Sequence, residues 1–135
     1  MTYDIRDIAL ADQGQRRIAW ATRNMPVLRQ ITEEFAASQP FAGRRIAAAL
    51  HITPETAVLM RALQAGGAEI ALSASNPLST RDDICAALAI DGMAVYATYG
   101  EDLATYQRHL EQTLAALSSL APYQKSSVPA RVSTR

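Results

Sequence analysis

Cysteine and long hydrophobic runs are nearly absent from this sequence. The single cysteine among 135 residues, Cys85, cannot form an internal disulfide, which favours a reducing compartment. No apolar run approaches the roughly 20 residues of a membrane-spanning helix. The first residues, Met-Thr-Tyr-Asp-Ile-Arg-Asp, have neither the basic start nor the apolar centre of a signal peptide. We therefore expect a cytoplasmic globular protein with no membrane partner.

Excess charge and the common cofactor motifs are missing as well. The 13 basic and 13 acidic residues cancel, so nothing in the overall charge indicates a nucleic-acid partner. The sequence contains no GxGxxG, no Walker loop, no CxxC pair and no HExxH, and it gives no support to a metal site. Hydrophobic residues make up 49% of the chain, which excludes wholesale disorder and fits one modest domain.

The C-terminal residues differ in composition from the rest. The only lysine, Lys125, lies there, and the last acidic residue is Glu111. Residues 121–135 have no periodic apolar face, so they cannot bury enough surface to offset the chain entropy of ordering. The sequence predicts one domain over 1–120 and a disordered tail over 121–135.

Apolar periodicity and turn residues predict two helices, followed by three strands that alternate with helices. The expected elements are helices over 8–23 and 26–37, strand 45–50, helix 54–64, strand 68–73, a helix capped by Ser79 or Thr80 and ending near 89, strand 93–97 and helix 102–120. This order predicts an α/β fold with a partial Rossmann-like parallel sheet. The two N-terminal helices should form a hairpin or lid packed on the sheet.

The end of the first predicted strand is the first candidate site. His51 follows the apolar run 45–50, and Thr53 and Glu55 flank the proline that begins the next helix. Ligands of open α/β sheets bind beyond the carboxyl ends of strands, and an imidazole there can transfer protons near neutral pH. Structural explanations stay open: His51 bonded to a backbone carbonyl, Thr53 as a helix N-cap and Glu55 as a first-turn acid.

The loop after the second strand is the second candidate. Asn76, Ser79 and Thr80 could donate hydrogen bonds to a ligand beside a helix N-terminus, although a turn with a capping residue explains them equally well. Cys85, among alanines, is predicted to be a small core residue. His109, between Arg108 and Glu111, is predicted to lie on the solvated surface.

Several linked motifs resemble S-adenosylhomocysteine hydrolase (adenosylhomocysteinase) over about residues 4–117. They are Asp4 to Ala11, Asn24-Met25-Pro26, Leu50 to Leu59, Gly67-Ala68-Glu69, Ser75 to Asp83, Val95-Tyr96-Ala97, Gly100-Glu101 and the helix from Tyr106 to Leu114. The resemblance implies a cytosolic, oligomeric, NAD-dependent enzyme of the methionine cycle and one-carbon metabolism, which reversibly hydrolyses S-adenosylhomocysteine to adenosine and homocysteine. In that scheme NAD oxidises the ribose 3'-hydroxyl, homocysteine is eliminated, water adds and the ketone is reduced again.

The resemblance also implies roles for the candidate residues. His51 matches a histidine placed for proton transfer beside the ribose, and Thr53 and Glu55 match residues that hydrogen-bond the adenine. The segment with Asn76, Ser79 and Thr80 matches a loop that lines the same substrate pocket.

The sequence departs from the family pattern at two positions and in its extent. Arg81 stands where the family usually has glutamine, and Tyr99 replaces a usual basic residue. The Asp-Asp-Gly-Gly-Asp strand, the catalytic lysine, a second catalytic histidine and the NAD-binding domain have no counterpart in these residues. We therefore expect a truncated segment of the substrate-binding domain, inactive alone and with no NAD bound. The alternatives are a non-catalytic module that binds adenosine or associates with a full-length subunit, and a remnant that folds poorly.

Overall fold

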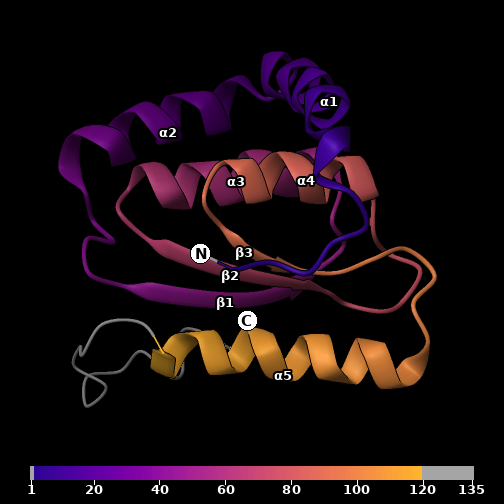
Figure 1. Ribbon diagram of the computed structural model, residues 1–135. Coiled ribbons are helices and arrows are strands. Elements are labelled where there is room, and N and C mark those ends of the chain that lie inside the picture. The colour runs from indigo at the N-terminus through magenta and orange to yellow at the C-terminus, as the bar shows by residue number, and fades with distance from the viewer. Residues whose placement is uncertain (1, 120–135) are drawn as a thin grey trace.

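The computed structural model describes residues 2–119, which form a three-stranded parallel sheet between helical layers (Figure 1). The elements in chain order are a 3-10 turn Ile8–Leu10, α1 Ala11–Arg23, α2 Pro26–Ser38, β1 Arg45–Leu50, α3 Pro54–Ala65, β2 Glu69–Ala74, α4 Asp82–Ile90, β3 Ala94–Tyr96 and α5 Leu103–Ser119. The α/β class, the two leading helices and the three alternating strands are thus confirmed. The predicted tail over 121–135 lies outside the described residues.

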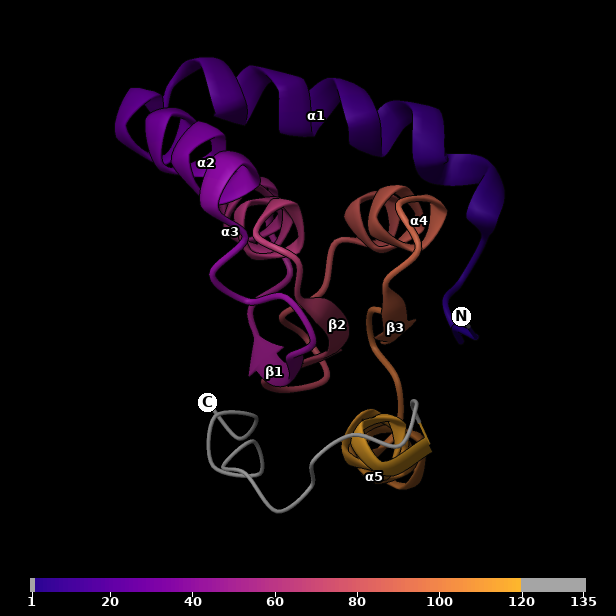
Figure 2. The same ribbon diagram turned by 90° about the vertical axis from the view of Figure 1, so that its left-hand side faces the viewer.

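The sheet has the strand order β1-β2-β3, with both neighbouring pairs parallel. Ile46 pairs with Ile70, and Leu72 pairs with Val95. These strands read as nearly continuous apolar runs, because helices cover both faces of the sheet. Figure 2 shows α3 and α4 on one face and α5 on the other.

The two N-terminal helices form an outer layer. The sequence placed them against the sheet, and this expectation is wrong: α1 packs on α4 and α3, and α2 packs on α3 (Figures 1 and 2). Ile18 and Ala21 of α1 are buried in the same hydrophobic core as Leu88 of α4. The α3–α4 layer is therefore apolar on both sides, which explains why α4 is buried along most of its length.

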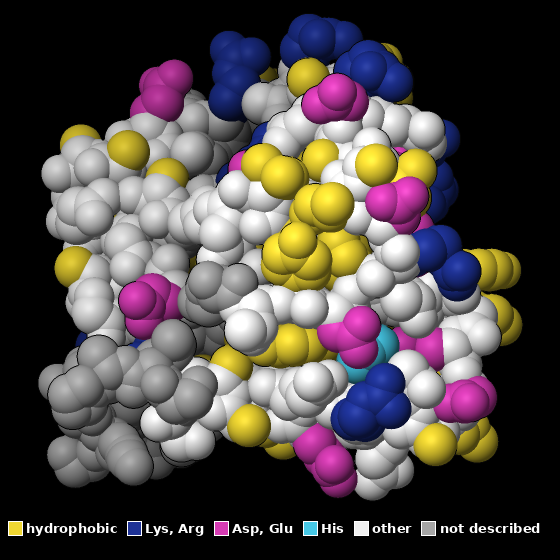
Figure 3. All heavy atoms as spheres, viewed as in Figure 1, with side chains coloured by type: hydrophobic (Ala, Val, Ile, Leu, Met, Phe, Trp, Pro, Cys, Tyr) yellow, Lys and Arg dark blue, Asp and Glu magenta, His cyan; other side chains and the backbone are white. Residues whose placement is uncertain are grey.

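The N-terminal segment before the 3-10 turn runs beside β3. The backbone N–H of Asp4 donates to the carbonyl of Val95 at 2.9 Å, and the N–H of Ala97 donates to the carbonyl of Asp4 at 3.1 Å. This bridge covers the outer edge of β3. No helix among the described residues is long and apolar enough to cross a membrane. On the face seen in Figure 3, arginine side chains gather over the outer helical layer.

Candidate functional site

The segments that follow β1 and β2 are joined to each other by backbone hydrogen bonds. The N–H of Ile52 donates to the carbonyl of Ser79 at 2.8 Å, and the N–H of Arg81 donates to the carbonyl of Ile52 at 3.1 Å. The N–H of Ser75 donates to the carbonyl of Leu50 at 3.1 Å. The two candidate segments of the sequence therefore lie side by side at the carboxyl edge of the sheet.

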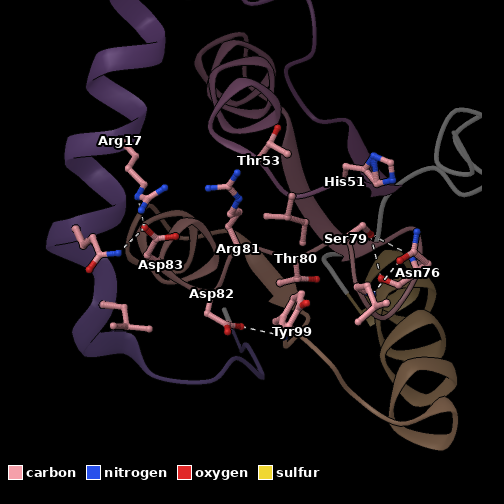
Figure 4. A pocket seen from close by; sticks show the side chains of 14 residues that line it. Arg17, His51, Thr53, Asn76, Ser79, Thr80, Arg81, Asp82, Asp83 and Tyr99 are labelled. Atoms are coloured by element: carbon pink, nitrogen blue, oxygen red, sulfur yellow. Dashed lines mark hydrogen bonds and ion pairs between the residues drawn. The ribbon is translucent and has the colours of Figure 1, made fainter.

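A cavity of about 650 Å³ opens at this edge (Figure 4). Its walls come from the two strand-end segments, the start of α4, the first helical turns of the chain and the loop after β3; the lining residues are Leu10, Gln13, Arg17, His51, Ile52, Thr53, Asn76, Leu78, Ser79, Thr80, Arg81, Asp82, Asp83 and Tyr99. Its size falls in the usual range of small-molecule sites, about 300–1,000 Å³. Five of the six predicted site residues line it, and Glu55 does not.

His51 and Thr53 are positioned by the start of α3. The Thr53 hydroxyl accepts a hydrogen bond from the N–H of Thr56 at 3.2 Å, so the N-cap interpretation of Thr53 is confirmed. The Thr56 hydroxyl donates to the carbonyl of His51 at 2.6 Å, which fixes the His51 backbone. The His51 ring is exposed and makes no hydrogen bond within residues 2–119, so the predicted alternative of a ring bonded to a backbone carbonyl is not seen.

Glu55 lies on the exposed face of the first turn of α3. This position favours a carboxylate because the N-terminus of a helix carries a partial positive charge. The first-turn interpretation of Glu55 is confirmed, and its role toward adenine stays a prediction.

The loop after β2 is held by its own side chains. The Asn76 Oδ1 atom accepts from the N–H of Leu78 at 2.9 Å, and the Ser79 hydroxyl accepts from the N–H of Asn76 at 3.1 Å. The Ser79 hydroxyl also donates to the carbonyl of Asn76 at 2.9 Å. The loop is therefore the turn that the sequence suggested, and the Asn76 amide nitrogen has no hydrogen-bond partner within residues 2–119.

The capping role predicted for Ser79 or Thr80 is wrong. Arg81 is the N-cap residue of α4 and makes no side-chain cap. Thr80 instead forms a parallel bridge with Ile52, which keeps its backbone in the sheet. Its Oγ1 atom is buried and has no hydrogen-bond partner among the described residues. A buried hydroxyl of this kind normally has a partner, so Thr80 remains a candidate contact for a ligand.

Two α1 side chains that the sequence did not indicate complete the cavity. Arg17 Nε lies 2.9 Å from Asp83 Oδ2, and Gln13 Nε2 donates to the same oxygen at 3.1 Å (Figure 4). Gln13 and Arg17 are four positions apart, which places them on one face of α1. This four-residue spacing is visible in the sequence, but it indicates a shared site only once α4 is known to pack against that face of α1.

The charges of the cavity are unevenly compensated. Asp82 is neutralised by Arg6 at 2.9 Å, and Asp83 by Arg17. Arg81 is exposed and forms no ion pair within residues 2–119. Among the described residues that line the cavity, Arg81 is therefore the one arginine without an ion-pair partner. No group of three His, Cys, Asp or Glu side chains within this range is arranged to hold a metal ion.

Comparison with known proteins gives the same assignment as the resemblance. A sequence model of the S-adenosyl-L-homocysteine hydrolase family matches residues 2–125 of this chain. The chain belongs to this family. It is 55% identical over 113 residues to the adenosylhomocysteinase of Thermosynechococcus vestitus and 51% identical over 115 residues to that of Aquifex aeolicus.

These matches cover most of this chain and a small part of each relative. The aligned residues are 83% of this chain and 26% of the Thermosynechococcus adenosylhomocysteinase, and 84% and 28% for the Aquifex protein. The chain thus spans about a quarter of the length of these S-adenosylhomocysteine hydrolases. Arg81 and Tyr99, the two positions at which the sequence analysis expects a departure from the family pattern, both line the cavity.

Proposed function

We propose that the cavity binds adenosine, either free or as the nucleoside part of S-adenosylhomocysteine. The observation that carries this proposal is the convergence of His51, Thr53, Asn76, Ser79 and Thr80 on one cavity, although they come from two separate segments of the chain. The site lies where α/β sheets bind ligands, beyond the carboxyl ends of adjacent parallel strands.

The polar groups of the cavity suit a nucleoside. The Asn76 amide supplies donors, the Thr80 hydroxyl can both donate and accept, and a ribose presents hydroxyls that do the same. Leu10, Leu78 and the Tyr99 ring offer apolar surface for a purine. His51 is exposed at the cavity, and neither ring nitrogen has a hydrogen-bond partner within residues 2–119, so it can give or take a proton at a ribose hydroxyl.

The family reaction needs a hydride acceptor, which NAD supplies when it is bound. The residues described here do not fit that cofactor. Neither turn that builds the cavity, 51–53 or 75–81, contains a glycine, whereas a dinucleotide pyrophosphate needs a glycine-rich strand-to-helix turn. We therefore expect these residues alone to bind adenosine in the cytoplasm and not to hydrolyse S-adenosylhomocysteine.

The outer edge of the sheet favours a second candidate function, association with a full-length subunit of the family. On its outer side β1 pairs with no described strand. Next to it, an apolar hollow of about 240 Å³ is lined mainly by the alanines 47–49 of β1 with Leu110 and Leu114 of α5. An unpaired edge beside apolar surface is a typical protein-contact site. Mixing this chain with a full-length adenosylhomocysteinase and measuring mass by light scattering would test this second function, since an unchanged elution of both proteins contradicts it.

The first function is tested by isothermal titration of the folded chain with adenosine, with circular dichroism as the fold control. We expect saturable binding, and at least a tenfold weaker affinity in His51→Ala and Asn76→Ala. Glu33→Ala, an exposed α2 carboxylate remote from the cavity, serves as the matched control for Glu55→Ala. Glu55→Ala then decides whether that residue contacts adenine. A folded wild-type chain that does not bind adenosine would refute the proposal.

A further inference from the structure

A histidine lies buried between two carboxylates on the side of the sheet opposite to α3 and α4. The His109 side chain of α5 is 1% exposed; its Nδ1 atom lies 2.6 Å from Glu101 Oε1 and its Nε2 atom lies 2.9 Å from Asp4 Oδ2. The prediction that His109 is a solvated surface residue is therefore wrong. His109 lies on a helix, as the sequence predicts, but the residues that cover its side chain come from other parts of the chain.

Both ring nitrogens of His109 are hydrogen-bonded to carboxyl oxygens, so the ring is held from two sides. The Glu101 side chain is also 1% exposed, and a buried charge is tolerated when it is paired. The other charged or titratable groups near the ring are Arg108, whose Nη2 lies 3.7 Å from Asp4 Oδ2, and Tyr96, whose ring centroid lies 6.5 Å from that of His109.

The two carboxylates belong to two separate segments. Asp4 sits in the N-terminal segment that forms the backbone bridge to β3. Glu101 ends the loop after β3, and its Oε1 atom also accepts from the N–H and the hydroxyl of Thr98, both at 3.3 Å. His109 thus ties the N-terminal segment and the loop over 98–101 to α5.

Both segments continue into the wall of the cavity. Arg6, two residues after Asp4, donates from Nη2 to the carbonyl of Tyr99 at 2.7 Å and pairs through Nε with Asp82 at 2.9 Å. The N–H of Tyr99 donates to Asp82 Oδ1 at 3.0 Å (Figure 4). Tyr99 and Asp82 line the cavity. The N-terminal segment and the loop over 98–101, both held by His109, therefore each connect to these two residues of the cavity wall.

We propose that His109 is a positioning residue for the nucleoside cavity: through the hydrogen bonds of its two ring nitrogens it holds Asp4 and Glu101, and thereby fixes Tyr99 and Asp82 in the wall. The proposal rests on the proposed function for the identity of the ligand.

The test follows the full chain by NMR and adenosine titration. His109→Gln shortens the reach of the two ring nitrogens to one polar group, and Glu111→Gln, an exposed residue of the same helix, is the control. We expect the amide signals of Ala97 and Tyr99 to move in His109→Gln and to keep their wild-type positions in Glu111→Gln. His109→Gln should also weaken adenosine binding at least fivefold, with Glu111→Gln unchanged.

The outcomes separate the two proposals. A wild-type chain that fails to bind adenosine refutes the proposed function, while the Tyr99 amide signal in His109→Gln still decides the positioning role. A Tyr99 amide signal at its wild-type position in a folded His109→Gln variant overturns that role, and Glu101→Gln, which alters the other end of the same contact, gives the same decision if His109→Gln does not fold. Wild-type affinity in a folded His109→Gln variant overturns it as well.

Discussion

Cys85 is a thiol closed off from solvent in the middle of α4. Burial raises the pKa of this thiol well above its ordinary value of 9.0, and the negative charges of Asp82 and Asp83 act in the same direction. The sequence predicted a small core residue here, and the structure confirms it. A thiol held neutral in this way is a poor nucleophile.

Two measurements follow from the raised pKa of Cys85. In the native chain at pH 8, iodoacetamide should leave Cys85 unmodified, and in urea it should react fully. Above pH 9.0 the unfolded thiol ionises and the folded one does not, so the free energy of unfolding should fall by about 1.4 kcal/mol per pH unit from this group. The difference between wild type and Cys85→Ala isolates the effect, and parallel pH profiles for the two would contradict it.

His109 shows why single residues are the hardest scale to predict. Its neighbours Arg108 and Glu111 are exposed, so the local pattern indicated a solvated helix face. Its partner Asp4 is 105 positions away in the sequence, and no local pattern can signal that contact. His51, in contrast, was predicted because its strand, turn and helix are adjacent in the chain.

Helices α1 and α4 approach each other closely at Gly14. A Cβ atom on Gly14 would overlap the backbone carbonyl of Asp83, which is too rigid to move aside. The two helices can therefore approach each other only where α1 has a glycine. This approach also brings Gln13 and Arg17 to Asp83 and closes one wall of the cavity.

We therefore expect Gly14→Ala to separate α1 from α4. Overpacking costs about 1–3 kcal/mol, and a backbone clash belongs at the upper end of that range, even though alanine is the better helix former. Urea unfolding should show this loss, and Arg16→Ala, exposed on the same helix, should change stability by less than about 0.5 kcal/mol. Equal stability of Gly14→Ala and wild type would disprove the packing argument.

The start of α5 depends on an exposed carboxylate. Asp102 Oδ1 accepts from the N–H of Thr105 at 2.8 Å, and this hydrogen bond lowers the pKa of Asp102. A lowered pKa means that the stabilisation is present at neutral pH and is lost as the pH falls below the ordinary value of 3.8. Asp102→Ala should reduce the melting temperature more at pH 7 than at pH 2.5, as measured by calorimetry; Glu111→Ala on the same helix should not show this dependence.

Elements were predicted better than their ends. The apolar pattern predicted β1 with the same bounds as the structure, and it predicted the end of α3 one residue too early. The start of α4 was misjudged because Ser79 and Thr80 are good capping residues in any local context. Their actual conformation is set by pairing with Ile52, a contact between two loops that local propensity does not contain.

The molecule as a whole has more layers than the sequence indicated. The pattern of alternating strands and helices predicted the parallel sheet, because right-handed crossovers are close to obligatory. It could not place α1 and α2, since an amphipathic helix packs equally well on a sheet or on other helices. Only the nearly unbroken apolar surface of α4 indicates that two layers cover it.

The stability of the whole chain should report ligand binding. If adenosine binds only the folded state, a concentration one hundred times its Kd stabilises the chain by about 2.7 kcal/mol. Scanning calorimetry should show a melting temperature that rises with adenosine concentration, with uridine as a control for nonspecific effects. The rise should disappear in His51→Ala, and a rise of the same size in that variant would place the binding elsewhere.

The bridge between Ile52 and Thr80 joins the two strand-end segments that form part of the cavity wall. The N–H of Ile52 donates to the carbonyl of Ser79, and the carbonyl of Ile52 accepts from the N–H of Arg81. The two segments therefore cannot shift relative to each other without breaking both hydrogen bonds. These hydrogen bonds oppose a hinge motion between β1 and β2 at the cavity. The loop with Tyr99 is tied to the segment after β2 as well, since the N–H of Gly100 donates to the carbonyl of Pro77 at 2.8 Å. An opening that admits a ligand is therefore expected on the side of α1, which no backbone hydrogen bond among the described residues joins to the strand-end segments.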